Sequence, residues 1–387
     1  MTDLRHVRLG DLLGQARAAT VLRNAIGRDR VAHAYLFWGP EGVGKGTAAT
    51  SFAQALNCLT PPQDAAPDAC GECQSCRRIA TGVHTDVRLV TLDTDQQGRR
   101  RTEISIDQIR QNPDPRKPRV TPRPLIQDAY LKPTLGRHKV YIVDPADRMS
   151  TEAGNALLRV LEDPPLHVVL ILVTDSPSGL LPTLLSRCQQ VAFQRAGTAA
   201  VEERLAAMGV EPEVAQSVAG LSGGRIGWAI RAARQPQILA TRNALLDLCA
   251  DLGHQGVPGG LRMAEEIKLL AGELAAASAE AAAEEDDEGA AAGREQAAGD
   301  RALRAQLPWC LDVMASWYRD ELAAVHGAPF LNSDYGDALQ KASEGSGGAE
   351  AEAAIEAILT TKQWIQRNAN IDLALESLAI ALLAGAG

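Results

Sequence analysis

A glycine-rich run between a predicted strand and a predicted helix constrains the fold of this chain more than any other segment. The run Gly39–Lys45 reads GPEGVGK and directly follows the apolar run Ala34–Trp38. Glycines let the backbone curl so that several N–H groups point at one phosphate, and the N-terminus of the following helix adds a favourable dipole. This order of strand, loop and helix is the context that a Walker A phosphate loop requires. The sequence therefore predicts an α/β P-loop core in which the phosphates of ATP or ADP are bound by Gly39, Gly42, Gly44 and Lys45.

Two positions that carry catalytic groups in a P-loop ATPase are altered. The residue after the loop lysine should offer a hydroxyl to magnesium but is Gly46, and Thr47 follows one residue, about 100° of helix turn, too late. The predicted strand Val140–Val143 ends at Asp144, which can orient a metal-bound water. The next position, where an ATPase carries its general base, is Pro145, which has no ionisable group. We expect a degenerate nucleotide site that binds ATP or ADP weakly or not at all.

Four of the seven cysteines form a cluster, Cys58-x11-Cys70-x2-Cys73-x2-Cys76, within nineteen residues. Cysteines separated by two residues can bind the same tetrahedral ion, and four thiolates complete the coordination shell. With no position left for a catalytic water, the pattern predicts structural zinc. The alternative is a set of free thiols in a redox-sensing loop. Since Cys73 belongs to two overlapping pairs, the spacing leaves the geometry of the site open.

Strand and helix signals alternate through the first half of the chain. Helical spacing between the apolar runs, as in Thr47–Leu56 and Thr151–Leu161, predicts a mostly parallel sheet with helices on its faces. The five predicted strands are Ala34–Trp38, Val87–Leu92, Val140–Val143, Val168–Val173 and, more weakly, Gln190–Phe193.

Strand signals end near residue 196, and Ala- and Leu-rich helical patterns follow. We predict three domains: 1–195 with the nucleotide-binding core and the cysteine module at 58–76, a small helical lid at 196–236, and a larger helical domain at 237–387. An Ala/Glu/Gly-rich stretch at about 275–300 has little to bury and repels itself, so it is predicted to be a disordered acidic insertion. The alternative function for it is mimicry of a nucleic-acid backbone. A second segment without assigned structure is the Pro-rich stretch 112–124.

The charge balance narrows the possible partners. The net charge is −9 and the sequence pI is about 5.4, whereas a general nucleic-acid binder is usually basic.

No apolar stretch approaches the roughly 18 residues that a membrane span needs, and the N-terminus has no apolar signal-peptide core. An odd number of cysteines argues against a disulfide framework. These features predict a cytoplasmic protein without membrane contact.

The order of the motifs resembles that in subunits of the bacterial DNA polymerase III clamp loader, which are AAA+ proteins. The similarity extends over nearly the whole chain except the acidic insertion and the Pro-rich stretch. Within this family the ATP-hydrolysing gamma and tau subunits keep the magnesium ligand and the general base, so Gly46 and Pro145 favour the delta-prime type. Besides the phosphate loop, the four cysteines and Asp144, the motifs are Leu13-Gly14-Gln15, Ala32–Phe37, Leu161–Pro165, Ser186-Arg187-Cys188, Arg367–Asn370 and Leu373–Glu376.

The resemblance implies roles for residues that composition alone would leave unassigned. In the family, the arginine at the position of Arg187 leaves its own subunit and reaches the nucleotide of a neighbour as an arginine finger. Thr174 matches the polar sensor-1 position. The sensor-2 position falls on Gly227, with Arg225 close enough for a shift of register. The implied partners are gamma/tau and delta subunits in a heteropentamer held by a C-terminal helical collar, together with the sliding clamp and primed DNA.

Three functions compete on this evidence. The first is a non-catalytic clamp-loader subunit that donates Arg187. The second is an active gamma/tau-type ATPase in which Thr47 and Asp147 act in displaced roles, although Asp147 is better explained as a turn or cap residue before the next helix. The third is a zinc-dependent DNA-binding factor, against which the acidic balance argues.

Overall fold

The computed structural model of the chain describes residues 7–62, 66–93, 101–110, 123–252, 256–283, 295–345 and 348–385. The chain forms two compact units. The first comprises Met1–Ala215 with Ser222–Ala229, and the second comprises Gln216–Leu221 with Ile230–Gly387. The finer division of the first unit into a core and a lid, predicted from the loss of strand signals, stays a prediction.

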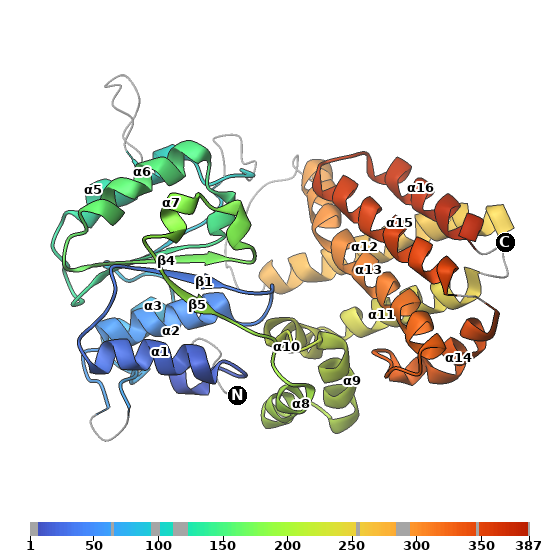
Figure 1. Cartoon of the computed structure of the whole chain (residues 1–387), viewed down its shortest axis with the longest axis horizontal. Helices are drawn as coiled ribbons and strands as arrows, with labels where there is room; N and C mark the ends of the chain where they lie inside the picture. The colour runs from blue at the N-terminus through green and yellow to red at the C-terminus, as the bar shows by residue number, and fades with distance from the viewer. Residues whose placement is uncertain are drawn as a thin grey trace. The chain divides into compact units, whose positions relative to one another are not determined.

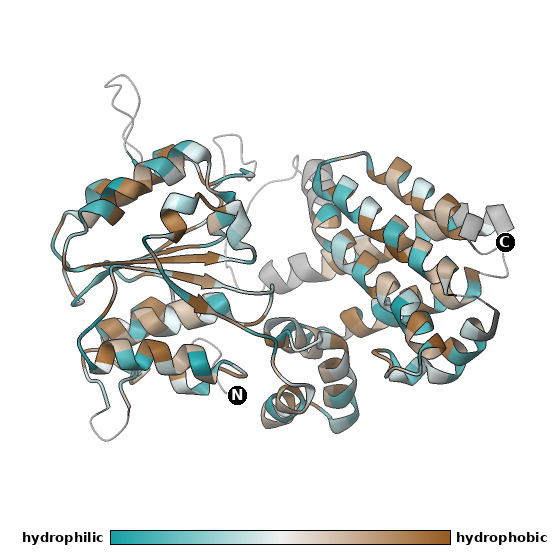
Figure 2. Cartoon of the chain, viewed as in Figure 1, coloured by the Kyte–Doolittle hydropathy of each residue, from teal (hydrophilic) through white to brown (hydrophobic). Residues whose placement is uncertain are grey.

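The first unit is built on a five-stranded parallel sheet in the order β2-β3-β4-β1-β5. Its strands are β1 (Ala34–Trp38), β2 (Val87–Val90), β3 (Lys139–Val143), β4 (Val168–Thr174) and β5 (Gln189–Ala192). The three central strands are apolar along nearly their whole length because both faces of the sheet are covered (Figure 2). The predicted α/β fold with a parallel five-stranded sheet is therefore confirmed.

Helices cover both faces of the sheet (Figure 1). Neighbouring strand residues point to opposite faces, so Phe37 packs with Phe52 under one layer while Leu36 packs with Leu157 under the other. The first layer is α1 (Ala16–Gly27), α2 (Lys45–Asn57) and α3 (Gln74–Ala80), and the second is α4 (Ile106–Ile109), α5 (Leu125–Ala129), α6 (Thr151–Glu162) and α7 (Pro182–Leu185).

Short helices connect and follow the sheet. The segment 196–236, for which helical patterns were predicted, contains α8 (Thr198–Ala207), α9 (Pro212–Ser222) and α10 (Ile226–Arg234). Gly223 ends α9 in the left-handed conformation that a helix C-terminus favours. The 3-10 turns of this unit are η1 (Leu9–Asp11), η2 (Ala146–Arg148) and η3 (Pro177–Gly179).

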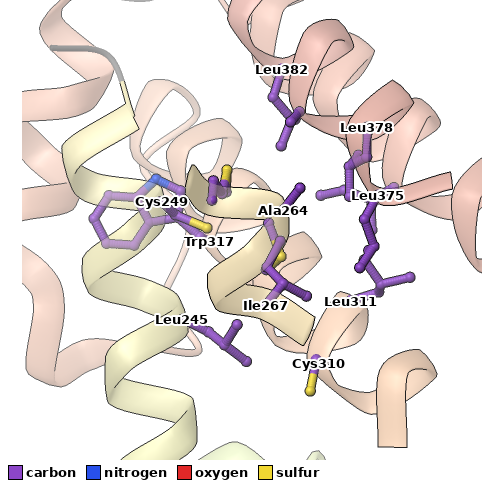
Figure 3. Close-up of a cluster of buried hydrophobic side chains, with 14 of the residues drawn as sticks. Leu245, Cys249, Ala264, Ile267, Cys310, Leu311, Trp317, Leu375, Leu378 and Leu382 are labelled. Carbon is purple, nitrogen blue, oxygen red and sulfur yellow. The ribbon is translucent and has the colours of Figure 1, made fainter. Parts of the chain in front are cut away.

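In the described residues of the second unit all regular secondary structure is helical, and the unit has its own apolar core. Side chains from α11, α12, α13 and α16 converge there, including Leu245, Ile267, Trp317 and Leu375 (Figure 3). The Trp317 indole N–H donates to Glu321 Oε1 at 2.6 Å, which satisfies its one polar atom. The elements are α11 (Pro236–Leu252), α12 (Gly256–Ala283), α13 (Glu295–Val325), η4 (Ser333–Tyr335), α14 (Gly336–Gly345), α15 (Ala349–Gln366) and α16 (Ile371–Gly385).

Part of the stretch predicted to be an acidic insertion lies in two described helices. Helix α12 continues to Ala283 and α13 begins at Glu295, so both ends of the stretch predicted to be disordered are helical. Alanine is the best helix former, which explains why the Ala-rich ends extend the two helices. Residues 284–294 and most of the Pro-rich stretch 112–124 lie outside the described residues. Among the helices of the described ranges, none combines the length and the apolar character that crossing a bilayer requires.

Candidate nucleotide site and metal centre

The glycine-rich loop has the curled backbone that its sequence predicts. Gly39, Gly42 and Gly44 have φ angles of 147°, 77° and 96°, a region that residues with a Cβ rarely adopt. A Cβ on Gly39 would lie only 2.2 Å from the carbonyl oxygen of Phe193, just beyond β5. The loop is therefore packed against the end of the edge strand, and its first position accepts only glycine.

Lys45 is tied to the loop and to the end of β4. Its ammonium group donates to the carbonyl oxygens of Gly39 and Pro40, both at 2.7 Å, and to Asp175 Oδ1 at 2.6 Å. The lysine side chain is 6% exposed, whereas that of Asp175 is 57% exposed. Asp175 was not predicted as a site residue from the sequence, although it directly follows Thr174, the polar residue that ends β4.

Asp144 stands opposite the position that lacks a hydroxyl. A Cβ built on Gly46 would lie 3.2 Å from Asp144 Oδ2, so the carboxylate reaches the first turn of α2. The neighbouring Thr47 is exposed, as its rotation by one residue along the helix predicts. Burial raises the pKa of Asp144, Lys45 opposes this shift, and the nearby Asp175 and Asp147 raise it further.

Thr174 and Asp147 form a second pair beside this site. Thr174, 1% exposed at the end of β4, donates its hydroxyl proton to Asp147 Oδ1 at 2.7 Å. Asp147 lies in the turn η2, and Ser150 caps α6 by accepting from the N–H of Ala153 at 3.2 Å. Asp147 is thus a turn residue, as its position predicted, and its side chain is bonded to Thr174. Pro145 occupies the position where a general base was expected.

Two further contacts fix the outer side of the loop. The Gln15 side chain joins it to the chain after β5, donating to the carbonyl oxygens of Gln194 at 2.6 Å and Val43 at 3.4 Å. From the start of α10, the N–H of Gly227 donates to the Gly42 carbonyl at 2.8 Å, and a Cβ on Gly227 would lie 3.2 Å from that oxygen. The backbone at Gly227, the predicted sensor-2 position, therefore lies directly on the loop.

The Arg225 side chain, the alternative at this position, lies over the ring of Trp228 at 5.8 Å from the centroid. Its Nε donates to the Ser222 carbonyl at 3.0 Å. A β-carbon on Gly42 would lie 3.3 Å from the Cβ of Arg225, so this residue also packs beside the loop. With the shift of register considered from the sequence, an arginine therefore lies beside the phosphate loop.

The four clustered cysteines meet in one place. The sulfur atoms of Cys58, Cys70, Cys73 and Cys76 all lie within 4.8 Å of one another, a separation that fits four thiolates around one tetrahedral ion. Backbone N–H groups of Cys70, Cys73 and Cys76 point at the preceding cysteine sulfurs at 3.3, 3.3 and 3.4 Å. The geometry of this cysteine centre therefore suits a metal ion held by all four residues.

Hydrogen bonds favour the thiolate form of Cys70 in particular. Burial alone would raise the pKa of Cys70, but the Thr60 hydroxyl and the N–H groups of Cys73 and Glu72 lower it to about 6. Burial raises the pKa of Cys76, and a bound cation would stabilise its thiolate.

Arg187 lies at the surface, two residues after the end of α7. Its guanidinium donates to the Thr183 carbonyl and to Glu162 Oε1, both at 3.2 Å. The two side chains of the ion pair are 37% and 57% exposed. An exposed pair of this kind contributes little stability, so the guanidinium can exchange Glu162 for another anion. Cys188, which follows Arg187, is half-buried. Burial raises the pKa of its thiol to about 12, which is consistent with a packing role.

Comparison with known proteins identifies related chains. Residues 14–197 match the family model described as the delta subunit of DNA polymerase III. The delta' subunit of Bacillus subtilis is 32% identical over 235 residues, which cover 60% of this chain and 64% of the relative. The delta' subunit of Pseudomonas aeruginosa is 38% identical over 200 residues, covering 51% and 55%. The tau subunit of Bacillus subtilis is 35% identical over 201 residues, covering 52% and 31%.

These matches confirm the resemblance to DNA polymerase III subunits that the order of the motifs predicted, over 51% to 60% of this chain. The chain spans less than two thirds of the length of each of these three relatives. The family model covers the phosphate loop, the cysteine centre and Arg187 and ends before the helical second unit.

Proposed function

We propose that this chain, which is similar over part of its length to delta-prime and tau subunits of bacterial DNA polymerase III, acts as a delta-prime-type subunit of a clamp loader. The observation that carries the proposal is the state of the phosphate loop. The loop keeps its fold and Lys45, yet Gly46 offers no hydroxyl and Pro145 offers no base. Such a subunit stabilises an assembly and contributes to loading the sliding clamp on primed DNA without hydrolysing ATP itself.

Arg187 is the residue that we propose to act in catalysis, on a nucleotide bound by a neighbouring subunit. A guanidinium is permanently charged and forked, so it can stabilise the charge that develops on a transferring phosphoryl group. Exposure of Arg187 and its weak pairing with Glu162 support this role, since the side chain can leave its own surface at little cost.

The cysteine centre is proposed to hold a structural zinc ion. Four sulfur ligands leave no coordination position for water, so the ion would supply folding energy rather than catalysis. The proposed partners are gamma/tau and delta subunits, which the similarity to delta-prime and tau relatives supports. Contacts with the clamp and with DNA would be made by the assembled complex.

The test measures ATP turnover at two levels of assembly. The purified chain with ATP and magnesium should show only background hydrolysis, whereas a rate comparable to that of a gamma/tau subunit would overturn the proposal. The reconstituted complex carrying Arg187→Ala should assemble normally but lose about ten-fold or more of its DNA-stimulated ATPase, as removal of an arginine finger predicts. Arg159→Ala, at an exposed arginine of α6, is the matched control and should leave the rate unchanged.

The similarity to tau supports one alternative function, an active clamp-loader ATPase. In that case Thr47 would supply the magnesium ligand and Asp147 the base. Exposure of Thr47 and the hydrogen bond between Asp147 and Thr174 favour the non-hydrolysing subunit. Turnover by the isolated chain that is abolished in Asp147→Asn would instead support the alternative.

A further inference from the structure

All three protons of the Lys45 ammonium group already have acceptors within the chain. A lysine ammonium has three donors and no acceptor. The carbonyl oxygens of Gly39 and Pro40 and the carboxylate of Asp175 take one each, at 2.7, 2.7 and 2.6 Å. The lysine is therefore satisfied in the absence of a phosphate group.

The residues on either side of Asp175 are hydrogen-bonded to each other. The hydroxyl oxygen of Thr174 accepts from the N–H of Ser176 at 3.1 Å, and the same hydroxyl lies 3.0 Å from the Ser176 carbonyl. Thr174 is itself bonded to Asp147. These contacts on both sides of Asp175 shape the turn from which its carboxylate reaches Lys45.

The ion pair occupies the place where the lysine of a phosphate loop meets a phosphate. A phosphate that bound here would have to displace the Asp175 carboxylate from Lys45. It would also bring negative charge close to Asp144, whose carboxylate reaches the same turn of α2 at Gly46. Because the Asp175 side chain is 57% exposed, it can move into water when it is displaced.

We infer that Asp175 acts as an internal competitor of nucleotide phosphate, which neutralises Lys45 and keeps the loop folded while the site is empty. The inference rests on the proposed function only in treating the loop as a former nucleotide site. In this proposal the Asp175 carboxylate weakens nucleotide binding, whereas Gly46 and Pro145 account for the expected loss of hydrolysis.

The test measures binding without hydrolysis. Calorimetric titration of the full chain with ADP, with and without magnesium, is compared between wild type and Asp175→Asn. The asparagine keeps the size of the side chain but removes its charge, so ADP should bind about five-fold more tightly or better, an amount in the range of one ion pair. Asp163→Asn, at an exposed carboxylate that ends α6, is the control and should bind as the wild type does. Equal or weaker ADP binding by folded Asp175→Asn overturns the inference.

Thermal unfolding gives a second readout on the same variants. Without nucleotide, Asp175→Asn should have a lower Tm than the wild type, because Lys45 has lost the only one of its three acceptors that carries a charge. Added ADP should raise its Tm by more than it raises that of the wild type. If Asp175→Asn does not fold, both measurements are made on Asp175→Ala. An increase in Tm on adding ADP that is no larger than that of the wild type overturns the inference. ATP turnover by the wild type would contradict the proposed function and leave these binding results unaffected.

Discussion

The carboxylate of Asp68, inside the cysteine loop, accepts a hydrogen bond from the backbone N–H of Leu9 at 3.0 Å. The same carboxylate accepts from the N–H groups of Gly10 at 3.1 Å and Ala69 at 2.9 Å, and it pairs with Arg23 of α1 at 3.3 Å. Asp68 is 4% exposed. The loop that carries the cysteines therefore also holds the segment around Leu9 and Gly10 in place beside α1.

Replacement of Asp68 should release this N-terminal segment. Asp68→Asn keeps one oxygen but turns the other into a donor, which leaves backbone N–H groups without an acceptor. A loss of about 1–3 kcal/mol in unfolding free energy is expected, the usual cost of an unsatisfied buried group, and hydrogen exchange at Leu9 and Gly10 should accelerate. Asp11→Asn, at an exposed carboxylate of η1, is the control. Unchanged exchange at Leu9 would refute the anchoring role of Asp68.

Metal analysis of the purified chain should find one zinc ion per chain. Cys76→Ser should lose the metal and lower the Tm of the first unit, because three thiolates hold zinc less well than four and binding energy contributes to folding. Cys310→Ser, at a buried cysteine of the second unit, should keep the metal. A chain that is fully folded and metal-free after expression with zinc would instead favour free thiols.

The first glycine of the phosphate loop should tolerate no side chain. Gly39→Ala combines a positive φ with a Cβ 2.2 Å from the Phe193 oxygen, so it should destabilise the first unit by about 2 kcal/mol or more. Gly197→Ala is the matched control, because a Cβ there meets nothing within 4 Å. Urea unfolding of both variants measures the difference, and equal stabilities would show that the loop does not need this curl.

Acid should weaken the first unit through Asp86. Burial alone would raise the pKa of Asp86, but hydrogen bonds from the N–H groups of Gly136, Leu135 and Thr134 outweigh it and lower that pKa. A folded-state pKa below the unfolded value means that the carboxylate stabilises the fold above the unfolded pKa, about 3.9. This stability is lost as the pH falls through the folded-state pKa.

Asp86→Asn should therefore cost about 1–3 kcal/mol near pH 7, where the variant loses a charged acceptor. The difference in unfolding free energy between Asp86→Asn and the wild type should become smaller below about pH 4, where the wild-type carboxyl also takes up a proton. Unfolding curves measured across this pH range provide the test, with Asp107→Asn at a half-buried position of α4 as the control. If the difference in unfolding free energy does not change with pH, protonation of Asp86 is not coupled to unfolding.

Restoring hydrolysis should require two changes in the chain. Gly46→Ser returns a hydroxyl beside Asp144, but without a base at position 145 it should leave ATP turnover at background. The double variant with Pro145→Glu should be the first to show measurable turnover. Turnover by Gly46→Ser alone would show that another residue, with Asp147 the nearest candidate, serves as the base.

The sheet and the phosphate loop were predictable because their signals are local. Apolar runs of four to seven residues mark strands buried on both faces, and these matched β1, β3 and β4 closely. The Ala-rich ends of the stretch 275–300 are helical in the described residues, because the helix propensity of alanine prevails there. The cysteine spacing predicted a shared site, and the convergence of all four sulfur atoms agrees with it.

The sequence by itself determined which chemical groups the site has and which it lacks: a lysine and an aspartate remain, while the hydroxyl at position 46 and the base at position 145 are gone. Only the tertiary structure decided how the remaining groups pair. Lys45 meets Asp175 from 130 residues away, and Thr174 meets Asp147 from another strand end. No periodicity encodes such pairs, because they depend on which carboxyl ends of parallel strands the sheet order places side by side.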